Sequence, residues 1–322
     1  MSESASPPCA VTVAMVTYNS RAYVADAIAS VLGQHFEDFE LLICDDASTD
    51  GTWELITSCS DRRVRALRNP INIGEYPNRN QALARARGKY LIFIDGDDHL
   101  YPHGLGIMAE ALDRFPDAAF ASAQPPSDKF IYPLPLTSYE FYACQFLGPD
   151  ITAMNFTQLL FRVAPLRAAG GFDPAYRSGD THIQFVLGLT HACVLIANGL
   201  AWWRRRPGQA SESLLRDGWG SAELAQYGRA LLQDARCPLH PTQKRLAHAN
   251  ICRPLLKNVV RAMLRGRFIH AWRLLRYSGV SPIRLRHLFS RDRRPHWADV
   301  DASRALSRGA LRVSSGKAGA GQ

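Results

Sequence analysis

Short apolar runs alternate with helical segments over the first 124 residues, and this alternation restricts the fold of the chain more than any other feature. The predicted strands are VTVAMVT at 11–17, FELLIC at 39–44, RVRALRN at 63–69, YLIFID at 90–95 and AAFASAQ at 118–124. The predicted helices between them occupy 24–32, 51–59, 77–87 and 102–115. Strands separated by helices of about ten residues predict βαβ units and a largely parallel sheet.

Acidic side chains gather where two of these strands end. DDASTD follows the strand at 39–44, and DGDD follows the strand at 90–95. In parallel sheets ligands bind at the carboxyl ends of the strands, so the pattern predicts a ligand site there. Asp95, Asp97 and Asp98 would repel one another if ionised and unpaired, which leaves two interpretations. The cluster holds a cation, or it is an Asp-rich turn.

Two common phosphate-binding motifs are absent from the sequence, namely GxGxxG after the first strand and GxxxxGK[ST]. A nucleotide diphosphate would therefore need another positive charge to neutralise it. Mg²⁺ or Mn²⁺ held by carboxylates supplies such a charge, because both ions prefer hard oxygen ligands.

Composition fits a soluble globular enzyme with one large domain and an extension, or with two domains, since 47% of the 322 residues are hydrophobic and 21% are charged. No apolar run is long enough to span a bilayer, and the first ten residues do not resemble a secretion signal. The seven cysteines are scattered, which predicts free thiols in a reducing compartment and argues against a zinc site.

Charge is divided unevenly along the chain. From Arg204 onward 24 basic and 7 acidic residues give a balance of +17, and the remaining residues give −8. The segment 125–150 predicts a long loop or a substrate-facing segment, and the region beyond about 220 predicts helices, one of them starting at Pro254. Four basic residues recur at every fourth position of that helix: Arg253, Lys257, Arg261 and Arg265.

This basic stripe has several interpretations that the sequence leaves open. It is a solvated face, it docks on the acidic first part of the chain, or it faces an anionic membrane surface. Nucleic acid ranks last, because no recognised nucleic-acid-binding pattern accompanies the charge.

The stretch VAMVTYNSRAYVADAIASVLGQHFEDFELLICDDASTDGT, followed by NIGEYPNRNQALARARGKYLIFIDGDD, resembles the family 2 glycosyltransferases of the GT-A fold. The resemblance is dense over residues 10–110 and reaches weakly to 213. It implies an α/β fold with a GT-A-like, mostly parallel sheet flanked by helices and a mainly helical C-terminal extension. The implied organisation is a disordered 1–9, a catalytic domain at 10–215 (a nucleotide-sugar half at 10–110 and an acceptor half at 111–215), a basic helical extension at 216–297 and a disordered tail at 298–322.

The resemblance also implies roles for residues of the donor site. The implied donor residues are Tyr18 packing on the base, Asp46 accepting a hydrogen bond from it, Asp45 orienting the loop, Arg79 approaching the diphosphate, Asn80 bracing the loop, and Asp95 near the ribose. Asp97 and Asp98 would hold the metal. For Asp45 and Asp46 the alternative is an Asx-turn with a helix cap. WWRRRPGQASES at 202–213 resembles the segment that closes the donor site, where three arginines beside two tryptophans would bind phosphate or stack on sugar. The alternative is a basic strand edge or linker.

Asp180 in YRSGDTHIQF lies where the family has Glu-Asp before a helix, so the resemblance implies that Asp180 is the general base. Gly179 replaces the first residue of that pair, which is a departure from the family. A plain helix N-cap is the alternative for Asp180. Asp173 is the rival carboxylate, and His182 is expected to pack or to contact the acceptor.

The implied activity is transfer of a sugar from a nucleotide diphosphate sugar to the hydroxyl of a saccharide or glycolipid acceptor, with inversion and a metal, in cell-envelope polysaccharide synthesis. The expected location is cytoplasmic, with peripheral contact at the inner face of the membrane and no nucleic-acid partner. One alternative is a catalytically silent protein of the same fold that binds lipid or polymer. Another is a sugar-phosphate nucleotidyltransferase, although that class needs a Gly- and Lys-rich loop and TYNSRAY at 17–23 is not one.

Overall fold

The computed structural model describes residues 9–126, 130–148, 151, 155–205 and 217–280. The predicted disordered ends apart from Cys9, the predicted extension beyond residue 280 and the part of WWRRRPGQASES after Arg205 lie outside the described residues.

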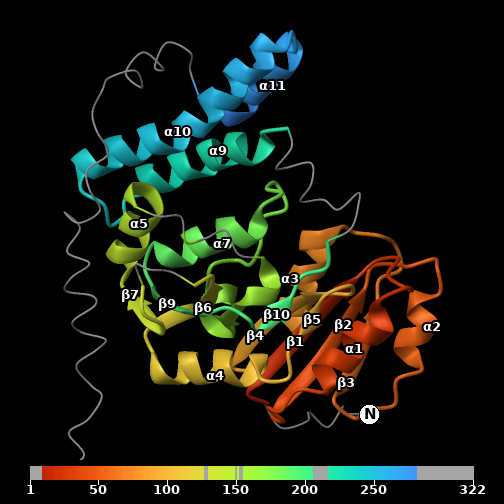
Figure 1. Cartoon of the computed structure of the whole chain (residues 1–322). Helices are drawn as coiled ribbons and strands as arrows, with labels where there is room; N and C mark the ends of the chain where they lie inside the picture. The colour runs from red at the N-terminus through yellow and green to blue at the C-terminus, as the bar shows by residue number, and fades with distance from the viewer. Residues whose placement is uncertain (1–8, 127–129, 149–150, 152–154, 206–216, 281–322) are drawn as a thin grey trace, which may run out of the picture.

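A mostly parallel sheet forms the centre of the molecule (Figure 1). Its strands in spatial order are β3 (Val64–Arg68), β2 (Phe39–Asp45), β1 (Val11–Thr17), β4 (Tyr90–Asp95), β8 (Leu159–Arg162), β6 (Ala118–Gln124), β9 (Ala192–Ala197) and β7 (Leu134–Leu136). β1, β2, β3 and β4 pair in parallel, and so do β6 and β9, whereas β8 and β7 run antiparallel to their neighbours. A two-stranded ribbon joins β5 (His99–Leu100) to β10 (Ala201–Trp202). This arrangement confirms the predicted α/β fold class.

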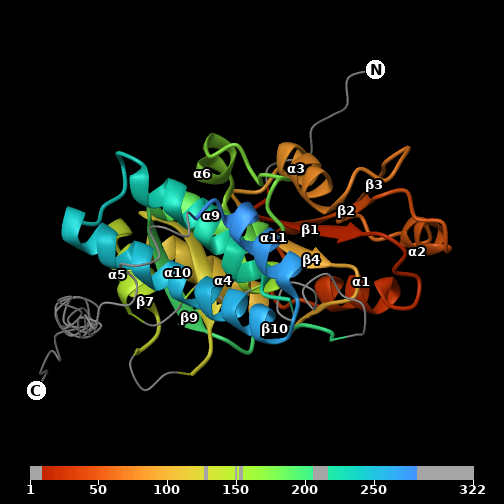
Figure 2. The ribbon, with the colours of Figure 1, turned by 90° about the horizontal axis from the view of Figure 1, so that it is seen from above.

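Side chains of the sheet alternate between two hydrophobic cores, because successive residues of a strand point to opposite faces. Val13 and Met15 of β1 face the core beneath α1 (Val24–Leu32), α2 (Thr52–Thr57) and α4 (Gly104–Arg114). Ala14 and Val16 face the other core. The helices on that second face are α3 (Glu75–Arg85), α5 (Ser138–Leu147), α6 (Val163–Ala168), α7 (Gly179–Gly188), α9 (Trp219–Gln233), α10 (Pro241–Leu264) and α11 (Phe268–Ser278). Figure 2 shows α9, α10 and α11 lying over this face.

The prediction of a long loop over 125–150 is wrong, because this segment contains β7 and the ten-residue helix α5. A capping box starts α5: Glu140 N donates to Thr137 Oγ1, and Thr137 N donates to Glu140 Oε2. The TSYE pattern that signals this box is present in the sequence. Weak periodicity hid the helix, because Phe141, Tyr142 and Phe146 are all buried and the polar face is narrow.

Pro254 does not start a helix, contrary to the prediction. α10 begins at Pro241, after a capping box between His240 and Gln243, and it continues through Pro254. Proline inside a helix costs a backbone hydrogen bond, and packing of the neighbouring turns offsets that cost. Ile251 and Leu255 on either side of Pro254 are buried in the same core as β1. The C-terminal helices therefore share a core with the sheet. Within the described residues no helix is both long enough and apolar enough to cross a membrane.

Candidate active site

The two aspartates at the end of β2 anchor loops. Asp45 accepts hydrogen bonds from the backbone and the hydroxyl of Ser48 at 3.0 and 2.5 Å. Asp46 Oδ1 accepts from Asn69 and from the backbone of Ile73, and Oδ2 accepts from the backbone of Gly74. Asp46 thereby fixes the loop that leads into α3. Asp45 bonds three residues ahead and also pairs with Arg68 at 3.5 Å, and the contacts of Asp46 reach residues far along the chain. The cap residue of α2 is Gly51, so the alternative of an Asx-turn with a helix cap fits neither aspartate.

Within the DGDD segment, Asp98 is almost completely buried and its two oxygens have different partners. Oδ2 accepts from the Thr157 hydroxyl at 2.7 Å, and Oδ1 accepts from the Arg204 backbone at 3.1 Å. Burial, together with the carboxylates of Asp95 and Asp97, raises the pKa of Asp98 to about 7, and the two hydrogen bonds act in the opposite direction. The segment thus concentrates negative charge at the end of β4.

Arg79 links α3 to this segment. Its guanidinium donates to Asp95 at 2.5 Å and to Glu75 at 3.1 Å, and it lies 3.9 Å from the centre of the Phe156 ring. Burial alone would lower the pKa of Arg79, but the two carboxylates outweigh that effect and raise it. Its Nη1 is buried and has no hydrogen-bond partner among the described residues. A buried donor without a partner is costly, so Nη1 is suited to an anionic ligand.

Asp180 lies in the first turn of α7, and the helix cap position belongs to Ser178. The N-cap alternative for Asp180 is therefore wrong. Burial, helped by the Glu75 carboxylate, raises the pKa of Asp180 to about 6. The Thr181 N–H, which donates to Oδ1 at 2.7 Å, and the Arg79 guanidinium act in the opposite direction. Because Glu75 and Arg79 both shift its pKa, Asp180 lies within electrostatic reach of the Arg79–Asp95 pair. A carboxyl group that titrates near 6 is ionised at neutral pH, as a general base must be.

Gly179 departs from the family pattern for a steric reason. A Cβ at this position would lie 2.4 Å from Cε1 of Tyr76, closer than real contacts allow. The Tyr76 hydroxyl donates to the carbonyl of Arg177 and accepts from the Gly179 N–H at 2.9 Å. The Tyr76 ring therefore occupies the space of a side chain and positions the start of α7.

We expect Gly179→Ala to displace the Tyr76 ring and lower the free energy of unfolding by about 1–3 kcal/mol, the usual cost of an overpacked site. Sugar transfer should fall as well, because Asp180 follows directly. Gly106→Ala is the matched control, since its nearest neighbour would be Phe36 Cβ at 3.7 Å and alanine favours a helix. Denaturant unfolding curves check the prediction, and equal stability of Gly179→Ala and Gly106→Ala would contradict it.

Glu223 of α9 is a site residue that the sequence analysis missed. Its side chain is buried and accepts hydrogen bonds from the backbones of Arg177 and Ser178 at 2.8 and 2.7 Å, from the Ser178 hydroxyl, and from the Tyr277 hydroxyl at 3.2 Å. The C-terminal helices thus hold the N-terminus of α7. No local motif marks Glu223, because its partners lie about 50 residues away.

Arg204 was expected only as part of a cationic group, and it has a defined position. Its backbone donates to Asp98, its Nε donates to the Asp97 carbonyl at 2.9 Å, and its guanidinium lies over the rings of Tyr23 and Trp202. It therefore connects β10 to the DGDD segment, as a segment closing the donor site would.

The other predicted residues occupy several environments. Tyr18 is half exposed in the loop after β1. Asn80 exchanges two hydrogen bonds with the backbone of Phe172 and so braces the loop before Asp173. Asp173 is exposed and accepts from the Ala175 backbone in a turn. His182 packs against aromatic rings, and burial lowers its pKa.

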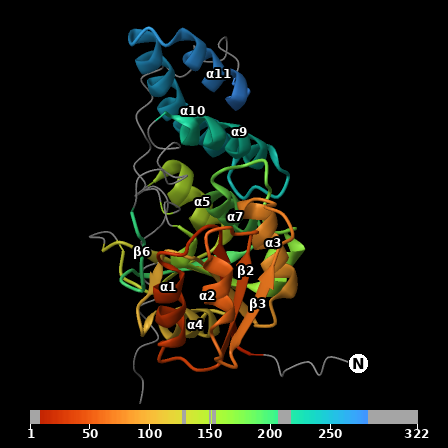
Figure 3. The same cartoon turned by 90° about the vertical axis from the view of Figure 1, so that its right-hand side faces the viewer.

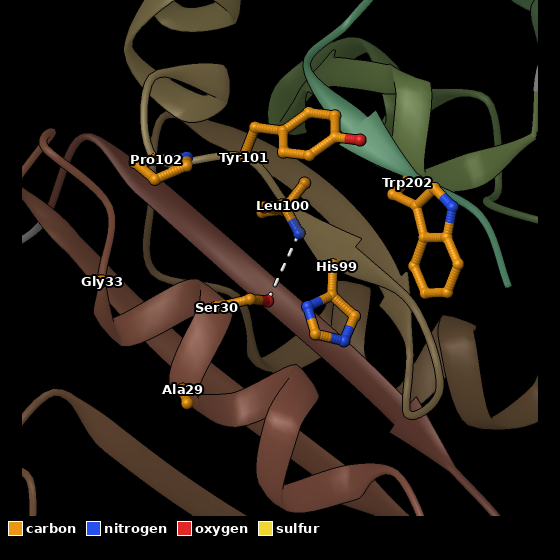
Figure 4. Close-up of a pocket in the computed structure, with 8 residues that line it drawn as sticks. All are labelled: Ala29, Ser30, Gly33, His99, Leu100, Tyr101, Pro102 and Trp202. Carbon is orange, nitrogen blue, oxygen red and sulfur yellow. Dashed lines mark hydrogen bonds between the residues drawn. The ribbon is translucent and has the colours of Figure 1, made fainter.

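A pocket of about 440 Å³ lies beside the DGDD segment, over α1 (Figure 4). Its lining includes His99, Tyr101 and Trp202, and the Leu100 N–H donates to Ser30 Oγ at its floor. α1 covers the sheet face opposite to α3 and α7, so this pocket does not contain Asp180 or Arg79.

The carboxylates of the DGDD segment fit a magnesium-type ion. Among the described residues no three His, Cys, Asp or Glu side chains lie together as a metal cluster. Mg²⁺ is commonly held by one or two carboxylates together with substrate phosphates. Asp97 is largely buried at this point, and Asp98 is held by Thr157 and Arg204.

Comparison with known proteins agrees with the resemblance noted in the sequence. Residues 12–168 match the model of the family described as glycosyl transferase family 2. A putative colanic acid biosynthesis glycosyl transferase of Escherichia coli K12 is 31% identical over 180 residues, covering 51% of this chain and 63% of the relative. An E. coli β-1,3-glucosyltransferase, named as transferring from UDP-Glc to α-D-GlcNAc-diphosphoundecaprenol, is 36% identical over 28% of this chain and 36% of its own length. The matches thus span less than two thirds of these relatives.

Solved structures support the fold. S. aureus TarS in complex with UDP-GlcNAc superimposes with a TM-score of 0.66 and 18% identity, covering 92% of this chain and 88% of the other. A mannosyltransferase of Pyrobaculum calidifontis in complex with GDP-Man and Mn²⁺ gives a TM-score of 0.59 and 18% identity, covering 93% and 81%. Over residues 12–168, just under half of its length, this chain is thus similar to glycosyl transferase family 2.

Proposed function

We propose that the protein transfers a sugar from a nucleotide diphosphate sugar to an acceptor hydroxyl with inversion at the anomeric carbon. The observation that carries the proposal is the placement of Asp180. This carboxyl group, with a raised pKa, lies within electrostatic reach of Arg79, whose Nη1 has no partner among the described residues. A base and an anion-binding donor near one another are what transfer from a diphosphate requires.

In the proposed reaction Asp180 takes the proton of the acceptor hydroxyl as its oxygen attacks the anomeric carbon. The bond from that carbon to the diphosphate oxygen breaks, and the nucleoside diphosphate leaves with the electron pair. Arg79 stabilises the negative charge that grows on the leaving group, and it does so without reorganising because Asp95 and Glu75 hold it in place. Tyr18 would pack on the base, Asp46 would accept a hydrogen bond from it, and Asp95 would lie near the ribose.

We propose Mg²⁺ or Mn²⁺ as the cofactor, with Asp97 as a ligand. The sequence predicts Asp98 as a second ligand, but its contacts with Thr157 and Arg204 favour a role in bracing the segment. When bound, the ion neutralises charge on the diphosphate. The Mn²⁺ in the mannosyltransferase complex supports this choice.

The acceptor that we propose is a saccharide or glycolipid of the cell envelope. Two relatives bear the names of colanic acid and teichuronic acid biosynthesis, and a third is named for a lipid-diphosphate acceptor. We place the protein in the cytoplasm with peripheral contact at the inner face of the membrane. All seven cysteines are free thiols, which supports a reducing compartment.

Thermal unfolding with a panel of nucleotide sugars, each with and without Mn²⁺, tests the donor proposal. A ligand that binds the folded state raises its apparent stability, so one nucleotide sugar should raise the midpoint and EDTA should abolish the gain. No stabilisation by any nucleotide sugar would contradict the proposal.

We further expect the rate of transfer to rise with pH through about 6. The base is active when ionised, so activity is lost as pH falls through the pKa of Asp180. Glu75→Gln removes a negative charge that raises this pKa, so the midpoint should move to lower pH. A pH profile of kcat/KM for both proteins checks the shift. A midpoint that is unmoved in Glu75→Gln would show that another group titrates.

A further inference from the structure

The turn between α10 and α11 carries large apolar side chains that face solvent. We define the apolar tip as Val260, Met263, Leu264, Phe268, Ile269 and Trp272, all of them exposed. Leu264 is 84% exposed and Ile269 is 70% exposed, so these side chains contribute little to the core. Single exposed apolar residues are ordinary, but a contiguous cluster marks a surface that binds a partner.

Each of the two helices carries its part of the tip on one face, and a short turn joins the two parts. Val260, Met263 and Leu264 are three and four residues apart on α10, which places them on one face. Arg267 N donates to the Ala262 carbonyl at 2.9 Å, and Gly266 adopts the left-handed conformation that the tight turn needs. The remaining faces of the helices are buried through Val259 and Ala262 on α10 and through Leu274 on α11. α10 and α11 lie at the end of the molecule farthest from α4 (Figures 1 and 3).

Positive charge surrounds the apolar tip. Residues 253–276 contain seven basic residues and no acidic residue. Lys257, Arg261 and Arg265 are exposed on α10, and Arg276 lies over the ring of Trp272 at 5.2 Å. Arg267 also pairs at 3.5 Å with Asp217, which lies just before α9. Apolar side chains rimmed by basic ones are typical of helices that lie in the headgroup region of a bilayer.

We propose that the apolar tip inserts into an anionic membrane, with the surrounding basic residues contacting lipid phosphates. The inference rests on the proposed function, because it places the enzyme where a lipid-linked acceptor lies. It also moves the membrane contact expected from the sequence, which was a basic stripe along one helix, to the turn between α10 and α11. Trp272 suits this position, since tryptophan favours the membrane–water interface.

Charge favours an anionic membrane over two other candidates for covering the apolar tip, a second copy of the chain and the segment 281–322. A second copy of the chain would bring seven basic residues of each copy together, which is unfavourable. Residues 281–322 contain nine basic and three acidic residues, so that segment is also of the same sign as the tip. An anionic lipid surface is complementary to it.

Sedimentation of the full chain with vesicles tests the proposal. The protein should sediment with equimolar phosphatidylcholine and phosphatidylglycerol, and not with phosphatidylcholine alone. The combined change Leu264→Ser, Phe268→Ser and Ile269→Ser should weaken this binding about tenfold or more, since full burial of one such side chain already changes an equilibrium by about that factor. Ile131→Ser is the matched control, because Ile131 is 79% exposed and lies outside the tip, and it should bind as wild type.

A second set of variants separates charge from insertion. Changing Lys257, Arg261 and Arg265 to Gln should weaken binding by about fivefold per residue at low salt and reduce its salt dependence. Brominated lipid should quench tryptophan fluorescence in the wild type, and Trp272→Phe should remove most of that quenching.

Equal binding of the wild type to neutral and anionic vesicles, or unchanged vesicle binding by the serine variant, would overturn the proposal. A serine variant that loses self-association but keeps vesicle binding would also overturn it, because the tip would then bind a second copy of the chain. Stabilisation by the nucleotide sugar should be equal in the wild type and the serine variant. That measurement reports the donor site alone, so failure of the membrane proposal and failure of the proposed function give different results.

Discussion

Asp180→Asn should lower the rate of sugar transfer by about a hundredfold or more, the usual scale of general-base catalysis. Asparagine keeps the size of the side chain but cannot take a proton from the acceptor. The fold should tolerate the change, because burial raises the pKa of Asp180 to about 6 and the folded state gains nothing from its charge at neutral pH. Steady-state kinetics with a saturating donor, together with a thermal unfolding curve, measure both effects.

Asp173→Asn is the matched control for this experiment. Asp173 is the rival carboxylate, but it is exposed and its side chain closes a turn with Ala175. We expect its transfer rate to stay close to that of the wild type. If Asp173→Asn loses transfer and Asp180→Asn keeps it, the two assignments are reversed.

Asp97→Asn should have a comparably large effect through a different step. Removing a charged ligand should abolish the part of donor binding that depends on Mn²⁺ and should lower transfer by about a hundredfold or more, as loss of transition-state charge stabilisation does. Titration calorimetry of a nucleoside diphosphate with and without Mn²⁺ measures the first effect. Asp117→Asn, an exposed change away from the segment, serves as the control. Donor binding and turnover that EDTA leaves unchanged in the wild type would contradict the metal site.

The sheet was predictable because its strands are local patterns. Each of β1, β2, β4 and β6 is a short apolar run bounded by turn residues, and the alternation of strands and helices implies the parallel pairing. The loop prediction for 125–150 failed for the opposite reason. α5 is buried around most of its circumference, so it lacks the amphipathic period that identifies surface helices.

The candidate site was predictable where one segment carries the signal. Asp97 and Asp180 stand in recognisable stretches of sequence, and Asp97 lies just after the end of β4 while Asp180 lies in the first turn of α7. The residues that hold these stretches were not predictable. Glu223 holds the start of α7, and Arg204 holds the DGDD segment, through contacts that join parts of the chain about 45 and 106 residues apart.

The steric role of Tyr76 was not predictable from the sequence either. Its ring fills the space above Gly179, so the glycine at this family position is explained by a residue more than a hundred positions earlier. A single sequence displays the departure from the family pattern but not the side chain that compensates for it. Only the packing of α3 against the start of α7 connects the two residues.

Proton NMR of the complete reaction tests the central claim most directly. The sample contains the enzyme, Mn²⁺-free Mg²⁺ buffer, the nucleotide sugar that stabilises the fold, and a saccharide acceptor. We predict that a new glycosidic anomeric signal will grow as the donor signal decays, with the anomeric configuration opposite to that of the donor, and that Asp180→Asn will suppress it. A product of retained configuration, or release of nucleoside diphosphate without a new glycosidic signal, would contradict inverting sugar transfer by this protein.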